Sequence, residues 1–428
     1  MRLLRIFVVF GLLVTAQICS AGTWYGKETE HLAVFKNSVT DLVITLPLAK
    51  KMGAAPFADP RDGSCRRSHQ GLFNEVVTVL QEQPDEVQVS FDHMIYGFDE
   101  KTKQPLSTFW VHRKQLGFLR ELESQSVDLS VFPPPAGMFS GLVVVLALPW
   151  QMYSVGTRFV RVPAYDTPKE YGIRLFDTVK QRPLITKIPR DRVLVETKKS
   201  SQDCRKLFVA TLNNLIDYVQ ALPANKVIPY VWGGSSCLSF SEDGKFVSDG
   251  QCWVRTEYPL IYTGYDCSEL VWRLARICGI DEQVYKTTLA LWENGHALAD
   301  GEQLEDGDLI IIPGHVMLVG SVKKHELIEA SGYQFGYGNV HRVALAQRFE
   351  GIASYDELVK AYRAHQPLTL LQRDGAVQKQ YPEFKLIKLC TTETKRIQGD
   401  GNESGATEKR SNTRNTGDNG DEAAVRDV

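Results

Sequence analysis

One cysteine in this chain lies where its sulfur would be chemically activated. Cys267 follows Asp266 and opens a stretch in which apolar residues recur at helical spacing until Gly279. A thiol at a helix N-terminus lies beside unpaired backbone N–H groups and the positive end of the helix dipole, and both favour the thiolate. The sequence therefore predicts a reactive cysteine at the first turn of a helix over 267–278.

A histidine that can serve as a base lies forty-eight residues further along the chain. His315 stands at the start of an apolar segment, 314–319, that favours a strand. A nucleophile on a helix followed by a base on a strand is the sequence form of a Cys/His hydrolase. In such an enzyme His315 takes the proton of Cys267 and then gives a proton to the leaving amine. Taken singly, each residue has the plainer interpretation of a structural side chain.

The motifs around this pair occur in a recognisable order. They are Y-x-W-G-G at 230–234, D-C-S at 266–268, D-G-D-L at 306–309 and H-V at 315–316. This ordered set resembles the NlpC family of cell-wall cysteine peptidases, over residues 201–345. The resemblance implies an α+β papain-like catalytic domain.

The same resemblance assigns roles to residues near the thiol. Tyr230 matches the family tyrosine, whose hydroxyl would stabilise the oxyanion of the tetrahedral intermediate. Asp266 and Ser268 match residues that hold the free amine end of a stem peptide, and both also fit ordinary helix capping. Glu75 and Trp110 would help close that amine pocket, with barrel surface and barrel core as their alternative interpretations.

The third member of the catalytic set departs from the family pattern. The family often has a His in a segment of the form I-H-A, and the matching segment 327–331 places Glu329 there. A carboxylate can accept the imidazole N–H and stabilise the imidazolium, so Glu329 is the predicted orienting residue. The alternative is an ordinary strand-end charge, and His325 and His341 lie outside the matching segment.

Hydrophobic spacing predicts the elements that must position these residues. A helix over 204–222 opens the catalytic domain, and strands over 309–312, 316–320 and 326–330 follow the cysteine helix. Helices packed on an antiparallel sheet give an α+β core. Residues 346–390 contain an amphipathic stretch but receive no functional assignment.

The remaining segments predict a secreted, multidomain protein. Two arginines, an apolar run and small residues before Gly22 are typical of a secretory signal, so the mature chain is expected in the periplasm or outside the cell. The runs of β-branched and aromatic residues before the catalytic domain resemble bacterial SH3-like barrels. The expected divisions are a signal peptide 1–21, an SH3-like barrel 22–120, a second barrel 121–200, the catalytic domain 201–345, an extension 346–390 and a disordered tail 391–428.

Composition excludes several other function classes. The net charge of −2 gives no support for nucleic-acid binding, and no apolar run is long enough for a stable membrane span. The sequence has neither H-E-x-x-H nor paired C-x-x-C, so no metal and no cofactor are expected. Cleavage of the signal leaves seven cysteines, an odd number, so at least one stays unpaired in an oxidising compartment, and Cys267 is the expected free thiol. Cys237 and Cys252 flank a hairpin-like turn and could form a disulfide.

These observations predict a cysteine peptidase that hydrolyses an amide bond in peptidoglycan stem peptides or muropeptides through a thioester acyl-enzyme. Residue chemistry supports the acyl-enzyme route to an amide or ester, and the γ-D-glutamyl–diamino acid bond comes from the resemblance. Two alternatives stay open. One is a non-catalytic peptidoglycan-binding protein, and the other is an amidase or transacylase on the same core.

Overall fold

The computed structural model describes residues 25, 28–44, 67–98, 102, 104–134, 141–177, 182–222, 227–238, 252–254, 261–280 and 285–390. The predicted signal peptide 1–21 and the predicted tail 391–428 lie outside these residues. None of the helices in the described ranges has the length and apolar character that a membrane crossing requires.

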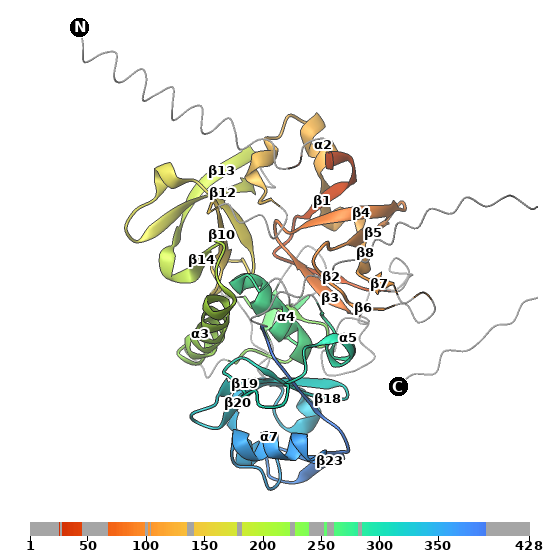
Figure 1. The fold of residues 1–428 in the computed structure, drawn as a ribbon. Helices are drawn as coiled ribbons and strands as arrows, with labels where there is room; N and C mark the ends of the chain where they lie inside the picture. Colours follow the sequence, from red (N-terminus) through yellow and green to blue (C-terminus); the bar gives the residue numbers. More distant parts are fainter. Residues whose placement is uncertain are drawn as a thin grey trace, which may run out of the picture. The chain divides into compact units, whose positions relative to one another are not determined.

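The N-terminal residues form an antiparallel five-stranded sheet with the order β8-β5-β4-β1-β9 (Figure 1). Its strands are β1 (Leu32–Phe35), β4 (Val76–Glu82), β5 (Glu86–Ser90), β8 (Thr108–His112) and β9 (Leu116–Phe118). Two short pairs accompany it, β2 (Val39–Leu42) with β3 (His69–Leu72) and β6 (Gly97–Phe98) with β7 (Pro105–Leu106), and helix α2 (Leu119–Ser124) follows. The β-branched and aromatic runs seen in the sequence are these strands, because such side chains pack well on a pleated surface.

A second antiparallel five-stranded sheet follows, with the order β13-β12-β11-β10-β14. Its strands are β10 (Val143–Leu146), β11 (Arg158–Arg161), β12 (Glu170–Asp177), β13 (Arg182–Pro189) and β14 (Val193–Val195). The sequence predicted strands at β10, β11 and β14 but not the long hairpin β12–β13. Most of β13 is exposed and rich in charged residues and proline, so it lacks the hydrophobic alternation that marks a half-buried strand.

The domain predicted to be catalytic is built on a third five-stranded antiparallel sheet (the catalytic sheet), with the order β21-β20-β19-β18-β24. Its strands are β18 (Leu309–Ile312), β19 (His315–Ser321), β20 (Glu326–Ser331), β21 (Asn339–Ala344) and β24 (Lys385–Ile387). Helices α3 (Ser201–Gln220) and α4 (Cys267–Cys278) pack together, and α4 packs on β19 and β20. The α+β arrangement predicted for this domain is confirmed.

Both faces of this sheet are buried. Leu309, Ile311 and Val316 belong to the core shared with α3 and α4. Ile310 and Ile312 belong to a second core, on the opposite face. This alternation is the period of two that a strand imposes on its side chains.

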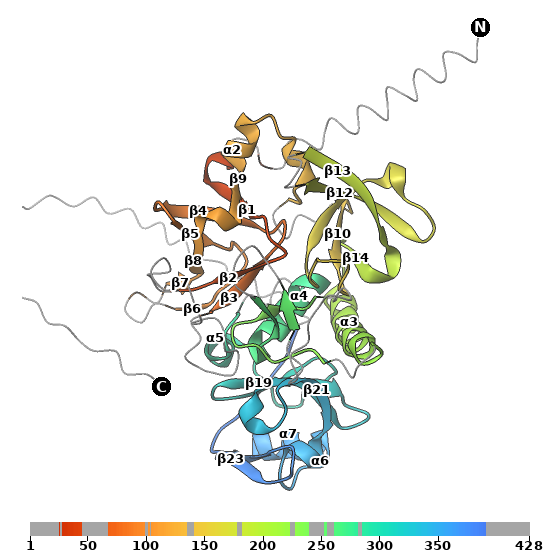
Figure 2. The same cartoon turned by 180° about the vertical axis from the view of Figure 1, so that it is seen from behind.

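The second core is supplied by the C-terminal extension, which the sequence left without a role. It contains α6 (Leu345–Arg348), α7 (Tyr355–Arg363), β22 (Leu368–Leu371) and β23 (Val377–Tyr381). Strand β24 then pairs with β18 and completes the catalytic sheet. In both views the sheet lies between α4 and these C-terminal elements (Figures 1 and 2). The catalytic sheet therefore extends beyond the predicted boundary at residue 345.

A small three-stranded sheet precedes the cysteine helix. Its strands are β15 (Ser235–Ser236), β16 (Cys252–Val254) and β17 (Ile261–Tyr265), and helix α5 (Thr288–Asn294) follows α4. Cys237 is a free, buried thiol, and burial raises its pKa to about 12. The predicted disulfide between Cys237 and Cys252 is therefore wrong.

Candidate active site

The cysteine helix begins where the sequence predicted. Asp266 is the N-cap of α4, and its Oδ1 accepts hydrogen bonds from the backbone N–H of Glu269 at 2.7 Å and from Ser268 Oγ at 3.1 Å. Its other oxygen, Oδ2, accepts the backbone N–H of Gly233 at 3.0 Å. One carboxylate thus holds both the first turn of the helix and the W-G-G segment, and places Cys267 at the helix N-terminus.

The W-G-G segment is held close to the N-terminal sheet region. Gly233 has a φ of +64°, and a Cβ at this position would lie 2.4 Å from the carbonyl oxygen of Arg67. Both the left-handed backbone and the close approach require glycine here. Arg67 in turn donates through Nη1 to the carbonyl oxygen of Trp232 at 3.1 Å and forms an ion pair with Asp41 at 2.8 Å.

His315 and Cys267 come together from β19 and α4. The side chain of Cys267 is close enough to the imidazole to raise the pKa of His315. The Cys267 Sγ also lies 3.9 Å from Thr288 Oγ1, at the start of α5. Cys267 is 7% exposed and the His315 side chain is 15% exposed, so the pair is largely shielded from bulk water.

Glu329 completes a line of three side chains. Its Oε2 lies 2.6 Å from His315 Nε2, and its side chain is fully buried. With Nε2 facing Glu329, Nδ1 is the ring nitrogen left for the thiol. Burial alone would raise the pKa of Glu329. The hydrogen bond of His315, the nearby His341 ring and the charge of Arg348 instead hold that pKa well below its usual range. Glu329 is therefore an ionised acceptor beside the imidazole.

The protonation of His315 follows from these neighbours. Burial by itself would lower the pKa of this imidazole, but the charges and hydrogen bonds of Cys267 and Glu329 outweigh burial and raise the pKa to about 9. At neutral pH the ring therefore holds the proton that a leaving amine would need.

Tyr230 lies in the same electrostatic environment. Burial, together with the charges of Cys267 and Asp266, raises the pKa of its phenol well above the usual range. The hydroxyl therefore keeps its proton and can donate a hydrogen bond. The backbone of Tyr230 is fixed by a bridge to Tyr265 and by its N–H, which donates to the carbonyl of Gly338 at 2.9 Å.

Asp266 and Ser268 are occupied by the capping contacts described above. Burial raises the pKa of Asp266 to about 6, against the charge of Lys286 and the hydrogen bonds from Glu269 and Ser268. Helix capping thus accounts for both side chains, and their contact with a substrate amine stays a prediction.

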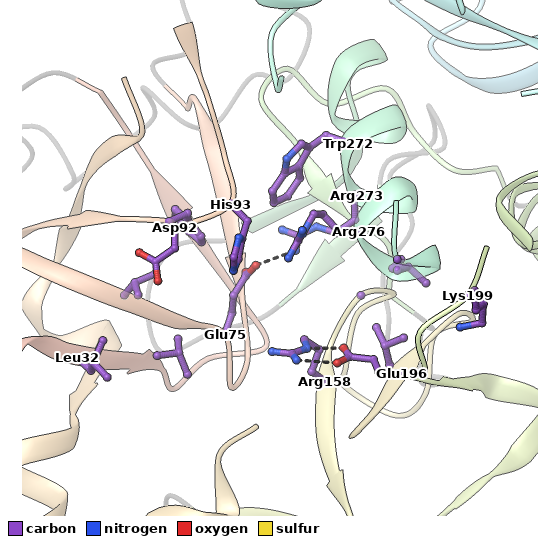
Figure 3. A pocket seen from close by; sticks show the side chains of 17 residues that line it. Leu32, Glu75, Asp92, His93, Arg158, Glu196, Lys199, Trp272, Arg273 and Arg276 are labelled. Carbon is purple, nitrogen blue, oxygen red and sulfur yellow. Dashed lines mark hydrogen bonds and ion pairs between the residues drawn. The ribbon is translucent and has the colours of Figure 1, made fainter. Parts of the chain in front are cut away.

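The structure gives Glu75 other partners than the thiol. Its Oε1 forms an ion pair at 3.0 Å with Arg273, and its Oε2 accepts the backbone N–H of Leu72 at 3.0 Å. Figure 3 shows the Glu75–Arg273 pair beside Arg158 in a pocket between α4 and the two N-terminal sheets. Of the described residues that line this pocket, none is Cys267, His315 or Glu329. Substrate contact by Glu75 stays a prediction.

Trp110, the other predicted pocket residue, is 7% exposed and lies in β8, where its backbone pairs with Val43. These observations match the barrel-core interpretation, and its contact with substrate also stays a prediction.

A buried polar network joins the N-terminal sheet region to α4. His69 Nδ1 lies 2.6 Å from Glu269 Oε1, and Lys286 Nζ lies 2.9 Å from the same oxygen. Burial and the charges of Arg273 and Lys286 hold the pKa of His69 well below its usual range, so the neutral ring donates to Glu269. Because these side chains are buried, the N-terminal region is part of what supports the cysteine helix.

Two contacts of the site were not predicted. Arg348 touches Glu329 from the extension, where the sequence pattern carried no functional signal. Thr288 approaches the thiol as the first residue of α5, and Thr287, the N-cap of that helix, is a capping signal that could have marked the position. His341, considered a less favoured orienting residue, lies 3.3 Å from Glu329 Oε1 through its Nε2.

Three solved structures are similar to this chain at low identity. An NlpC/P60 family protein from Bacillus cereus ATCC 10987 is 15% identical, with 73% of this chain and 94% of that chain covered and a TM-score of 0.42. NlpC2 from Trichomonas vaginalis is 12% identical, with 74% and 94% covered and a TM-score of 0.29. NlpC1 from the same organism is 11% identical, with 74% and 88% covered and a TM-score of 0.28. No protein-family model matches the sequence, and no curated protein matches it.

Proposed function

We propose that this chain is a secreted, NlpC-type cysteine peptidase that hydrolyses the γ-D-glutamyl–diamino acid amide bond of peptidoglycan stem peptides. The observation that carries the proposal is the 2.6 Å contact of His315 with the buried carboxylate of Glu329, on an imidazole whose pKa is also raised by Cys267 at the start of α4. A thiol at a helix start, a protonated imidazole and an ionised orienting group are what acyl transfer through a thioester requires.

The proposed reaction has two half-reactions. The Cys267 sulfur attacks the carbonyl carbon, the C–N bond breaks, and His315 gives its proton to the leaving amine. Water then attacks the thioester while His315 takes a proton from it, and the products are a carboxylic acid and the free thiol. Glu329 keeps the imidazole oriented and stabilises its charged form. Tyr230 Oη and the backbone N–H of Cys267 are the proposed donors to the oxyanion.

The substrate class rests on the ordered motifs in residues 201–345. The two N-terminal sheets are interpreted as SH3-like barrels because each has five antiparallel strands and lies before the catalytic domain. Export across the inner membrane, to the periplasm or the outside, belongs to the same proposal and rests on the signal-like residues 1–21.

Mass spectrometry of defined substrates tests the function. The mature chain is incubated with free stem peptides, muropeptides and intact sacculi, and with Cys267→Ala as the inactive variant. Cys237→Ala is the matched control, since Cys237 is a second buried thiol outside the proposed site. Cleavage of the γ-D-glutamyl–diamino acid bond by wild type and control, with none by Cys267→Ala, supports the proposal.

Other outcomes identify the alternatives. Binding to sacculi without cleavage of any substrate would indicate a non-catalytic wall-binding protein. Cleavage of a different amide would indicate an amidase, and transfer of the acyl group to an added amine rather than to water would indicate a transacylase.

A further inference from the structure

Three basic side chains surround the carboxylate that faces His315. Glu329 Oε2 bonds to His315, while Oε1 lies 2.7 Å from Arg348 Nε and 3.3 Å from His341 Nε2. Arg348 Nη2 also lies 3.3 Å from Oε2. A buried carboxylate is costly unless it is paired, so these neighbours decide whether Glu329 is ionised and where it points.

Among the three, Arg348 is the permanent charge. Its side chain is 0% exposed, and a guanidinium stays protonated at any pH that a folded protein tolerates. The charge of His315 changes during the proposed reaction, because the ring gives up and regains a proton. Arg348 therefore keeps a positive charge beside Glu329 through both half-reactions.

The position of Arg348 is fixed from the far side of the sheet. Its Nη1 donates to the carbonyl oxygen of Leu371 and to Gln378 Oε1, the latter at 2.9 Å. These two residues belong to the β22–β23 hairpin of the C-terminal extension. A continuous series of contacts thus runs from the hairpin through Arg348 and Glu329 to His315.

We propose that Arg348 is a positioning residue for the active site: its ion pair with Oε1 and its hydrogen bond to Oε2 hold the carboxylate of Glu329 against His315, so the C-terminal extension is a working part of the catalytic machinery. The kinetic part of this inference rests on the proposed function, while the geometric part does not. Loss of Arg348 would leave Glu329 free to rotate, and the bond to His315 would lengthen.

The first test is kinetic. Arg348→Gln should lower kcat by about ten-fold or more, the order seen when an outer partner of a functional histidine is removed, with KM changed by no more than about two-fold. Arg348→Lys, which keeps the charge, should recover part of kcat. Arg342→Gln is the matched control. Arg342 is a nearby arginine on β21, and it binds Asp217 at 2.7 Å instead of Glu329.

A double substitution separates positioning from general structural damage. In a Glu329→Gln background, Arg348→Gln should change kcat by less than about two-fold, because the residue through which Arg348 acts is already lost. A full ten-fold fall in that background would overturn the proposal.

The second test needs no substrate. A ring proton shared over 2.6 Å between His315 and Glu329 should give a far-downfield proton resonance in wild type and Arg342→Gln. Arg348→Gln should shift it upfield or remove it. If Arg348→Gln does not fold, Gln378→Ala loosens the same arginine without leaving a charge unpaired, and it should move the resonance in the same direction.

Failure of the positioning role of Arg348 can be distinguished from failure of the proposed peptidase function. Absence of peptide cleavage by wild type, with the resonance responding as expected, would remove the proposed function and leave the positioning role intact. An unchanged resonance and a wild-type kcat in folded Arg348→Gln would refute the positioning role while leaving the peptidase proposal standing.

Discussion

Replacement of Glu329 by Gln tests the central electrostatic relation of the site. The substitution keeps the size of the side chain and removes its charge. Gln can still accept a hydrogen bond from Arg348, but it stabilises an imidazolium less well than a carboxylate does. We expect the pKa of His315 to fall, because one of its two charge partners is lost and the charge of Arg348 is no longer balanced.

The structure sets the size of this effect. His315 has its pKa raised from 6.5 to about 9, which corresponds to about 3 kcal/mol in favour of the protonated ring. Cys267 and Glu329 share this stabilisation. An opposite charge at hydrogen-bond distance shifts a pKa by about 1–3 units, so the variant's His315 should titrate at least about one pH unit lower. By analogy with amide substitutions in other triads, kcat should fall by about ten-fold or more.

The raised pKa of His315 also determines how the stability of the protein changes with pH. Because the folded-state pKa of His315 lies above its unfolded value, its contribution to stability is fully present below about pH 6.5 and is lost as pH rises through about 9. In Glu329→Gln this loss should be complete at a lower pH. The alkaline limb of the rate profile should move to lower pH as well, since the protonated ring supplies the leaving-group proton.

Two measurements check this prediction. Titration of the His315 ring by NMR, with labelled histidine, gives the midpoint directly, and kcat against pH on a muropeptide gives the alkaline limb. Glu326→Gln is the matched control, because Glu326 lies on the same strand but does not touch His315. An unchanged midpoint together with a wild-type kcat in Glu329→Gln would refute the assignment of Glu329, and His341 would become the next candidate.

The remaining predictions concern the thiol, the third position, the cap and the N-terminal region. Cys267→Ala should abolish hydrolysis with little change in Tm. Iodoacetamide at neutral pH should label Cys267 in preference to Cys237, whose pKa is raised to about 12. Equal labelling of the two thiols would contradict this. Glu329→His should recover part of the activity that Glu329→Gln loses, and a fully inactive, folded variant would argue against it. The pKa of Asp266 is raised from 3.8 to about 6. The stability that the protonated carboxyl contributes should therefore be lost as pH rises from about 4 through 6. Asp266→Asn should remove that part of the pH dependence of the free energy of unfolding, measured by urea titration. Deletion of 23–120 should prevent cooperative unfolding of the remainder, since it strips buried partners from the cysteine helix; a wild-type Tm in the deletion variant would contradict this.

The local elements of the site were predictable from the sequence. The helix Cys267–Cys278 has the predicted bounds, with Asp266 as its cap and Gly279 in the left-handed conformation at its end. The strands at β18 and β19 also lie where the apolar runs indicated. Hydrophobic periodicity, helix capping and helix-ending glycines are properties of neighbouring residues, so they can be recognised without knowing the fold.

The roles of other residues depend on tertiary contacts with residues distant in the sequence. Glu329 was identified as one residue in a strand, but its ionisation is decided by His315, His341 and Arg348, which come from three other segments. Glu75 had a proposed substrate role, while its partner in the structure is Arg273 on the cysteine helix.

Tertiary structure alone decided the place of the C-terminal extension. Strand β24 joins the catalytic sheet and α7 covers its second face, although residues 346–390 carry no catalytic motif. The sequence determined the segments and the thiol at the helix start, because these follow from neighbouring residues. The charge and direction of the buried groups, Glu329 above all, follow from burial and from partners distant in sequence, and only the folded chain supplies both.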